Sequence, residues 1–397
     1  MNSIVRLTTL GWLVALSACA APSSQAVPVM PTAAFTHHAG TMDGGSALPG
    51  DGGSALPGDG GSALPGAQLV CALPSSSGYA GCTIAININV APLASPSTPA
   101  SLIPGLHPGD LQAAYALPSE NAGETVAIVD AYDDPSIESD LSVYRNAFGL
   151  PPCTSDNGCF RKVNERGVAG SYPAANDQWS QEIALDAEMV SAVCPHCSIL
   201  LVEANSASID DLGTSVDTAV GLGARVISNS YYASEWSGES AEEVHYQHPG
   251  VAVTVSSGDT PAPSYPAASQ YVTAVGGTTL TSSGETAWAD GGRGCSAYIA
   301  RPRWQSAGTC ATRSAVDVAA VADPQTGVAM FDAASGGWLV AGGTSVGAPI
   351  VGAAYALTGS PKPTAYSYGH PADFHDIGGA GYALATGLGS PNGVAGL

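Results

Sequence analysis

One short segment has the residue types of a catalytic nucleophile site. Residues 342–349 read GGTSVGAP, with Ser345 at the start of a run of small residues. Glycines before a serine at a helix start permit a tight turn and leave the hydroxyl exposed. The helix N-terminus also favours negative charge that develops nearby. We therefore predict that Ser345 is a nucleophile; the alternative is that it is the N-cap of a buried helix.

A second segment carries a pair of carboxylates. Residues 179–188 read WSQEIALDAE, which places Glu182 and Asp186 four positions apart and so on one face of a helix. Two such carboxylates repel when both are ionised, which raises one apparent pKa. A pair that shares a proton can act as base and acid at low pH. The alternative is a solvated acidic helix face.

A third segment ends at an aspartate. Residues 256–259 read SSGD and follow an apolar run at residues 251–255. The carboxyl group of Asp259 can donate a hydrogen bond to an oxyanion only while it is protonated, so this role requires acid pH. The alternative is a loop aspartate that caps a turn.

Together these segments resemble the sedolisins, the serine-carboxyl peptidases of the subtilisin-like clan. A subtilisin would have its base in a His-Gly-Thr-His type stretch, and none of the eight histidines here has that context. The resemblance runs from about Gly105 to the C-terminus. It implies a serine-type endopeptidase, active at acid pH, that forms an acyl-enzyme at Ser345. Glu182 would be the base, Asp186 would orient it, and Asp259 would stabilise the oxyanion.

Two other hypotheses stay open at this stage. One is a tethered, non-catalytic binding protein on a peptidase scaffold. The other is a thiol oxidoreductase that uses Cys194 and Cys197 of a Cys-Pro-His-Cys sequence. Because that sequence follows a predicted helix, whereas a redox motif usually opens one, we interpret it as a structural disulfide. Asp130 lies where a subtilisin keeps its catalytic aspartate; without a partner histidine, we interpret it as part of a local polar network.

The surrounding pattern predicts the elements that position these residues. Strand-like and helix-like runs alternate along the chain. The strand-like runs are 125–130, 198–203, 225–228, 251–256 and 271–275, and the helix-like runs are 180–193, 209–222 and 345–357. This alternation predicts an α/β, subtilisin-like fold with a mostly parallel β-sheet and helices on both faces. Sites in such sheets gather at the carboxyl ends of the strands.

The sedolisin resemblance also implies a calcium site near the C-terminus. Asp376 and Ile377 match the family's ligand pair, and Gly379 and Gly381 match two glycine carbonyls. The position of the family's second aspartate is Ala383, and the loop is short. Calcium prefers six or more oxygen ligands, usually with carboxylates among them. The sequence therefore leaves calcium open, and no other cofactor is expected.

The N-terminal region resembles an export signal followed by a tether. Residues 7–18 are mostly apolar and end in Leu-Ser-Ala before Cys19, which resembles a bacterial lipoprotein box. We predict a lipidated Cys19 and a location outside the cytoplasm at the cell envelope; the alternative is a secretory signal cut near Ala20 or Ala26. Residues 20–66 hold three copies of DGGSALPG and predict a disordered tether. Residues 67–104 form a short N-terminal segment, which we interpret either as a reduced pro-region or as an added edge element. The peptidase domain is predicted at residues 105–397.

The number of cysteines and the net charge limit which classes of protein the chain can belong to. Without Cys19, eight cysteines remain as four sequence-local couples, which suit disulfides in an oxidising compartment. The couples are Cys71/Cys82, Cys153/Cys159, Cys194/Cys197 and Cys295/Cys310. The formal net charge is −22, which repels phosphate backbones. We therefore expect polypeptide substrates, no nucleic acid, and membrane contact only through an N-terminal lipid; the oligomeric state stays open.

Overall fold

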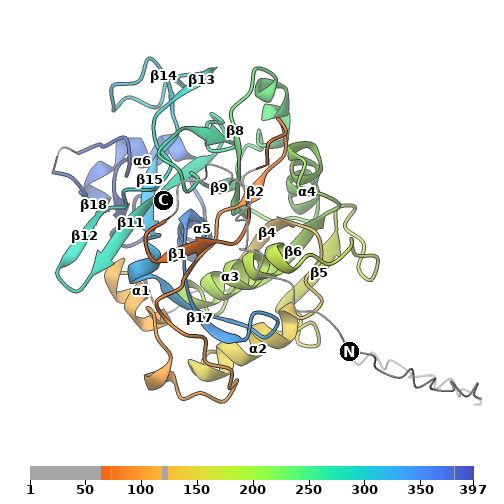
Figure 1. Ribbon diagram of the computed structural model, residues 1–397. Helices are drawn as coiled ribbons and strands as arrows, with labels where there is room; N and C mark the ends of the chain where they lie inside the picture. Colours follow the sequence, from red (N-terminus) through yellow and green to blue (C-terminus); the bar gives the residue numbers. More distant parts are fainter. Residues whose placement is uncertain (1–63, 73, 119–123, 380) are drawn as a thin grey trace, which may run out of the picture. The chain divides into compact units, whose positions relative to one another are not determined.

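The computed structural model describes residues 64–72, 74–118, 124–379 and 381–397 (Figure 1). All of them belong to a unit that spans Gly58–Leu397. The predicted signal peptide, Cys19 and most of the repeat segment lie outside the described residues. In the part of the chain that is described, no helix combines the length and the apolar character needed to cross a membrane.

An eight-stranded sheet forms the centre of this unit, and its strand pairs are parallel except for one antiparallel pair at an edge. Its strands are apolar and buried, as expected for a parallel sheet covered on both faces. In spatial order they are β12 (Gly284–Ala287), β11 (Thr273–Thr281), β9 (Ala252–Ser256), β7 (Val226–Asn229), β4 (Thr125–Ala131), β6 (Ser198–Ala204) and β5 (Phe160–Asn164), with β15 (Val318–Val321) also paired to β11. The predicted parallel sheet is confirmed.

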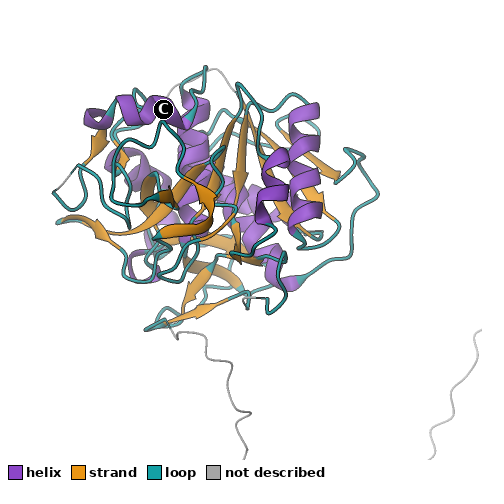
Figure 2. Cartoon of the chain, turned by 90° about the horizontal axis from the view of Figure 1, so that it is seen from above, coloured by secondary structure: helices purple, strands orange, loops and turns teal. Residues whose placement is uncertain are grey.

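Helices lie on both sides of these strands (Figure 2). The α-helices are α1 (Pro108–Ala114), α2 (Ile137–Ala147), α3 (Asp177–Val193), α4 (Ile209–Gly221), α5 (Thr344–Leu357) and α6 (Thr364–Gly369). The 3-10 helices are η1 (Ala100–Leu102), η2 (Glu239–His245), η3 (Pro324–Thr326) and η4 (Pro371–Asp373). The Asn176 side chain caps α3 by accepting hydrogen bonds from the amides of Gln178 and Trp179. Every residue of α5 is buried, because its glycines, alanines and valines let it pack closely against α3 and the sheet.

Smaller sheets join the N-terminal segment to the rest of the unit. One has the order β1 (Ala67–Leu69), β3 (Ala85–Asn87), β17 (Gly337–Gly342), β16 (Val328–Asp332). Another has the order β10 (Ser264–Tyr265), β8 (Tyr231–Ser234), β2 (Gly81–Cys82). Two short hairpins pair β13 (Cys295–Ala300) with β14 (Thr312–Ser314) and β18 (Phe374–His375) with β19 (Ser390–Pro391). The described residues before Gly105 are thus built into the sheets of the domain.

The four predicted cysteine couples all form disulfides. The bond between Cys194 and Cys197 links the end of α3 to the start of β6. Both cysteines are buried, which supports the interpretation of this motif as structural.

Candidate active site

The four predicted site residues come from three elements, which meet at the carboxyl ends of the central strands. Ser345 is the second residue of α5, and Glu182 and Asp186 lie one turn apart on α3. Asp259 follows β9 by three residues. Because α3 and α5 pack against each other, the carboxyl group of Glu182 comes close enough to Ser345 to interact with its hydroxyl. The structure therefore brings all four predicted catalytic residues together.

The turn before Ser345 requires glycine. Gly343 has a φ of +93°, a left-handed conformation that residues with a Cβ atom rarely adopt. A Cβ atom at this position would lie 1.9 Å from the Thr83 carbonyl oxygen and 2.7 Å from Asp259 Oδ2. The glycine therefore allows two oxygen atoms to approach the backbone just before the nucleophile.

The Ser345 hydroxyl is buried, although the sequence predicted that it would be exposed. Its exposed fraction is 0 %, and its Oγ lies 2.6 Å from the Thr83 hydroxyl. Ser345 Oγ also lies 3.5 Å from the Ser230 carbonyl oxygen. The physical reason for the difference is that the segment around Thr83 covers the turn.

A group of buried carboxylates adjoins Ser345. Glu182, Asp186 and Asp130 each have an exposed fraction of 0 %. Among the described residues, the oxygens of Glu182 and Asp130 have no hydrogen-bond partner. Asp186 Oδ1 accepts a hydrogen bond of 2.8 Å from Ser230 Oγ, and its Oδ2 has no such partner. These side chains thus meet one another and Ser345 rather than water.

Burial is the main cause of their altered proton affinity. It raises the pKa of Glu182 well above its ordinary value, the charges of Asp186 and Asp130 raise it further, and the Ser345 hydroxyl opposes the shift. The pKa of Asp186 is also raised well above its ordinary value by burial and then by the charge of Asp130. Burial raises the pKa of Asp130 to about 8. Such a group holds protons, so one ionised member is a strong base toward a neighbouring hydroxyl.

Asp259 is arranged as a hydrogen-bond donor in acid. Its Oδ1 accepts hydrogen bonds from the Thr344 amide at 2.8 Å and the Thr344 hydroxyl at 2.9 Å. Its Oδ2 is buried and has no partner among the described residues. Burial raises the pKa of Asp259 to about 7, against the lowering effect of the Thr344 bonds, and nearby Asp290 adds to the rise. The carboxyl group is therefore neutral at acid pH, and Oδ2 then carries a proton that it can donate.

The structure adds residues that sequence reasoning missed. Asp130, at the end of β4, belongs to the carboxylate group rather than to a separate polar network, and its place at the carboxyl end of a parallel strand was a usable signal. Ser230 holds Asp186, and Thr83 contacts Ser345. Neither of these two carries a local sequence signal, because their positions depend on how distant segments pair.

Comparisons with known proteins agree with this geometry. No protein-family model matches the chain. The chain is 29 % identical to kumamolisin of Bacillus sp. (strain MN-32) over 357 residues, which cover 72 % of the chain and 62 % of kumamolisin. It is 34 % identical to sedolisin of Pseudomonas sp. (strain 101) over 171 residues, which cover 34 % of the chain and 29 % of sedolisin. The chain is therefore similar in sequence to kumamolisin and to sedolisin. It spans less than two thirds of the length of either of these relatives.

A solved structure shows that the chain has the subtilisin-like fold. Pseudomonas sedolisin, described as a serine-carboxyl proteinase complexed with two molecules of pseudo-iodotyrostatin, superposes with a TM-score of 0.62 at 24 % identity. The match covers 73 % of this chain and 96 % of that structure. The predicted fold class is therefore confirmed.

Several oxygens of the predicted calcium loop already accept hydrogen bonds. The Gly381 amide donates to both carboxylate oxygens of Asp376, at 3.3 and 3.2 Å. The Ile377 carbonyl accepts a hydrogen bond of 3.1 Å from the Thr386 hydroxyl. Asp376 is the single carboxylate of the predicted set, which also includes Gly379, so the set falls short of what calcium prefers. Calcium binding at this loop stays a prediction.

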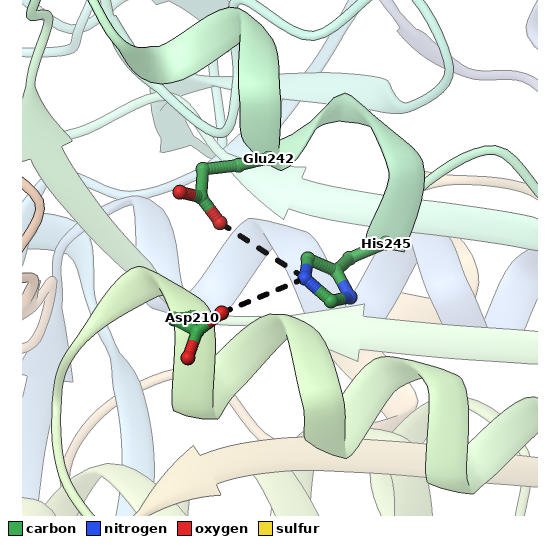
Figure 3. A group of neighbouring side chains, drawn as sticks. All are labelled: Asp210, Glu242 and His245. Atoms are coloured by element: carbon green, nitrogen blue, oxygen red, sulfur yellow. Dashed lines mark ion pairs between the residues drawn. The ribbon is translucent and has the colours of Figure 1, made fainter.

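A separate group with metal-ligand chemistry lies between α4 and η2 (Figure 3). Its members are Asp210, Glu242 and His245, with ligand atoms within 4.8 Å of one another. His245 Nε2 lies 3.9 Å from Asp210 and 4.0 Å from Glu242, while its Nδ1 lies 2.7 Å from Asp217. The Asp210 side chain is 80 % exposed, so this group faces solvent. Its ion pairs join α4 to η2, and none of them includes Ser345, Glu182, Asp186 or Asp259.

Proposed function

We propose that this protein is an exported, acid-active serine endopeptidase that hydrolyses polypeptides through an acyl-enzyme at Ser345. The observation that carries the proposal is the meeting of three chemical groups in one buried place. They are the Ser345 hydroxyl, the Glu182–Asp186 pair, and the unpartnered carboxyl oxygen of Asp259. Similarity to kumamolisin and to sedolisin, which is described as a serine-carboxyl proteinase, supports the same activity.

The proposed first step is acylation of Ser345. Its Oγ attacks the substrate carbonyl carbon while its proton passes to Glu182, whose raised pKa makes it an effective base when ionised. Asp186 shares a proton with Glu182 and is held by Ser230. Glu182 then gives a proton to the leaving amine. Water hydrolyses the ester by the same route in reverse, which regenerates Ser345.

The oxyanion is proposed to bind between Asp259 and the Ser345 amide. Protonated Asp259 would donate from Oδ2, because its Oδ1 is already occupied by Thr344. Donors placed where charge develops are worth about 10²–10³ in kcat each. Since Asp259 loses its proton near pH 7, this stabilisation operates in acid and fails above neutrality.

The test is cleavage of an acid-denatured protein by the full chain between about pH 2.5 and 7. We expect activity in acid that Ser345→Ala abolishes. Ser215→Ala is the matched control, because Ser215 is a buried serine whose hydroxyl donates to the Asp211 carbonyl within α4. Equal activity of wild type and Ser345→Ala at every pH would contradict the proposal and favour the tethered, non-catalytic binding protein.

Export and lipid anchoring are part of the proposal. The four disulfides support an oxidising compartment. Detergent partitioning of cells that express the wild type or Cys19→Ala tests the anchor: the wild type should follow the membrane, and the variant should be soluble. Calcium at the Asp376 loop is tested separately, by the thermal unfolding temperature with and without a calcium chelator.

A further inference from the structure

The packing of α4 against η2 brings one histidine and two carboxylates together at the surface. On η2, Glu242 and His245 are three positions apart, and residues at this spacing in a 3-10 helix lie on one face. Asp210 lies in the first turn of α4. Figure 3 shows the carboxyl groups of Asp210 and Glu242 turned toward the same nitrogen of the His245 ring, and this nitrogen is Nε2. Imidazole nitrogen and carboxylate oxygen are both zinc ligands.

The hydrogen bond at the other ring nitrogen determines which nitrogen of His245 can bind a metal ion. Nδ1 of His245 lies 2.7 Å from Asp217 Oδ2, and an ionised carboxylate only accepts hydrogen bonds, so Nδ1 carries a proton. In the neutral ring the lone pair is then on Nε2, which faces Asp210 and Glu242. A carboxylate that accepts a hydrogen bond from the far nitrogen is the usual support of a metal-binding histidine.

A glycine of α4 provides the space for the His245 ring. A Cβ atom at Gly213 would lie 2.7 Å from both Cγ and Cδ2 of His245, whereas non-bonded carbon atoms prefer about 3.5–4.0 Å. Asp210, Gly213 and Asp217 lie three and four positions apart and so on one face of α4. Glycine is unfavourable inside a helix, and here it lets the ring lie close enough to reach both aspartates. This contact is independent of the charges around the ring and fixes its orientation.

The charge around the ring suits a divalent cation. Asp210, Asp217 and Glu242 are negative when ionised, and their ion pairs within the described residues are with His245 and His248. The ion pairs of lysine and arginine in this part of the chain are all with other acids. A cation at Nε2 of the neutral ring would therefore supply the positive charge that these carboxylates lack.

Small movements would complete a coordination shell. Zinc ligands lie about 2.0–2.2 Å from the ion, so two of them at a tetrahedral angle are about 3.4 Å apart. The three ligand atoms of Asp210, Glu242 and His245 lie within 4.8 Å of one another. The Asp210 side chain is 80 % exposed, so it can rotate toward the other two, and water can fill the fourth position. The nitrogen ligand favours zinc over calcium and magnesium, which prefer oxygen.

We propose that Asp210, Glu242 and His245 bind a zinc ion. Asp217 is a positioning residue, because it orients the His245 ring without touching the ion. The connection between β8 and β9 contains η2, and β9 leads to Asp259, so the ion would fasten this connection to α4. The ion is structural and does not depend on the proposed peptidase activity. No cofactor besides calcium was expected from the sequence, since Asp210 lies far from Glu242 and His245 along the chain.

The test is zinc binding by the full chain, produced without a histidine tag and freed of metal. It is carried out at about pH 7.5, where most histidine is unprotonated and can bind a metal ion. Isothermal titration with zinc chloride gives the stoichiometry and the Kd, and thermal unfolding is followed with zinc and with a chelator. We expect one zinc ion per chain and a higher Tm in zinc. His245→Gln should weaken binding by about 100-fold or more, and its Tm should not respond to zinc.

Other variants separate the ligands from their surroundings. Asp210→Asn removes a ligand from an exposed position, so the variant should fold normally and bind zinc at least about tenfold more weakly. Asp217→Asn and Gly213→Ala remove no ligand but disturb the ring, and each should weaken binding by about 10–100-fold. The matched control is Asp211→Asn, because this neighbouring carboxylate accepts a hydrogen bond from the Ser206 hydroxyl instead. Its affinity for zinc should equal that of the wild type.

The chain offers another pair of histidines that could bind zinc, His37 and His38, which lie outside the described residues. The double variant His37→Gln/His38→Gln should bind zinc as the wild type does. Loss of binding in this variant, or binding that survives in His245→Gln, would place the ion elsewhere and overturn the proposal. Equal weakening by Asp210→Asn and Asp211→Asn would show general attraction to an acidic surface and would also overturn it. Absence of zinc binding by the wild type would leave the group as a set of ion pairs.

Discussion

Two regions of this molecule bury acidic side chains completely, but only one of them supplies the carboxylate with hydrogen-bond partners. Asp317 and Glu182 both have exposed fractions of 0 %. Asp317 accepts hydrogen bonds from Arg313, Tyr368, Gln305 and the Ala274 amide. Glu182 has no hydrogen-bond partner among the described residues, and its charged neighbours are other carboxylates. A buried acid with a full set of partners stabilises the fold. A buried acid without partners lowers the stability of the fold, and such acids are typical of catalytic sites.

The largest effect is expected from Glu182→Gln. The substitution keeps the shape of the side chain but removes the base, so kcat/KM should fall by about 10,000-fold or more. The matched control is Glu188→Gln on the same helix, where the carboxylate is also buried but accepts a hydrogen bond from the Phe331 amide instead. Glu188→Gln should leave activity nearly unchanged. Equal losses in the two variants would mean that damage to α3, and not loss of a base, explains the effect.

Asp317 and Asp130, one from each region, should respond in opposite directions to substitution by asparagine, as measured by the free energy of unfolding. Asp317→Asn removes the partner of buried Arg313 and should lower the free energy of unfolding by about 3–5 kcal/mol. Asp130→Asn should raise it at neutral pH by a few kcal/mol, since a pKa raised by burial from 3.8 to about 8 means that folding must retain a proton there.

The pH dependence of stability tests the predicted gain from Asp130→Asn. Below about pH 4 Asp130 is protonated in both the folded and the unfolded chain, so the gain from Asp130→Asn should vanish there. As the pH rises toward 8, the unfolded wild type releases this proton while the folded state keeps it, and the wild type loses stability relative to the variant. Denaturant unfolding at about pH 3 and pH 7 measures both effects. Destabilisation by Asp130→Asn at pH 7 would contradict the comparison.

The contrast between Asp317 and Glu182 also shows which features of the molecule can be predicted from the sequence alone. The alternating apolar runs predicted the sheet and its helices, and three local strings predicted Ser345, Glu182–Asp186 and Asp259. These signals are local, because helix periodicity and glycine-rich turns lie within a few residues. Thr83 could not be predicted in this way, since its contact with Ser345 joins residues 262 positions apart. Burial and the lack of partners, which separate Asp130 from Asp317, likewise arise only when distant segments pack.

A moderate effect is expected at Asp259. Asp259→Ala removes the proposed oxyanion donor and should lower kcat by about 10²–10³. Asp259→Asn keeps an oxygen for Thr344 and places an NH₂ group where Oδ2 lies, so its loss should be smaller. The pH profile of kcat tests whether Asp259 donates to the oxyanion. Wild-type kcat should fall as the pH rises through about 7, where Asp259 ionises, and the kcat of Asp259→Asn should not show this fall. The same fall in wild type and Asp259→Asn would remove Asp259 from the oxyanion site.

The smallest effect is expected where acids face water. Asp217 is 44 % exposed and lies 2.7 Å from His245 and 3.0 Å from His248, so solvent screens these pairs. His245→Gln should lower the free energy of unfolding by about 1 kcal/mol or less, and added salt should reduce the difference. It should leave kcat/KM unchanged, because the ion pairs of His245 are with Asp210, Asp217 and Glu242 and with no residue of the site around Ser345. If His245→Gln lowered the free energy of unfolding as much as Asp317→Asn, an exposed ion pair would stabilise the fold as much as a buried one. Burial and hydrogen-bond partners would then not explain the difference between these regions.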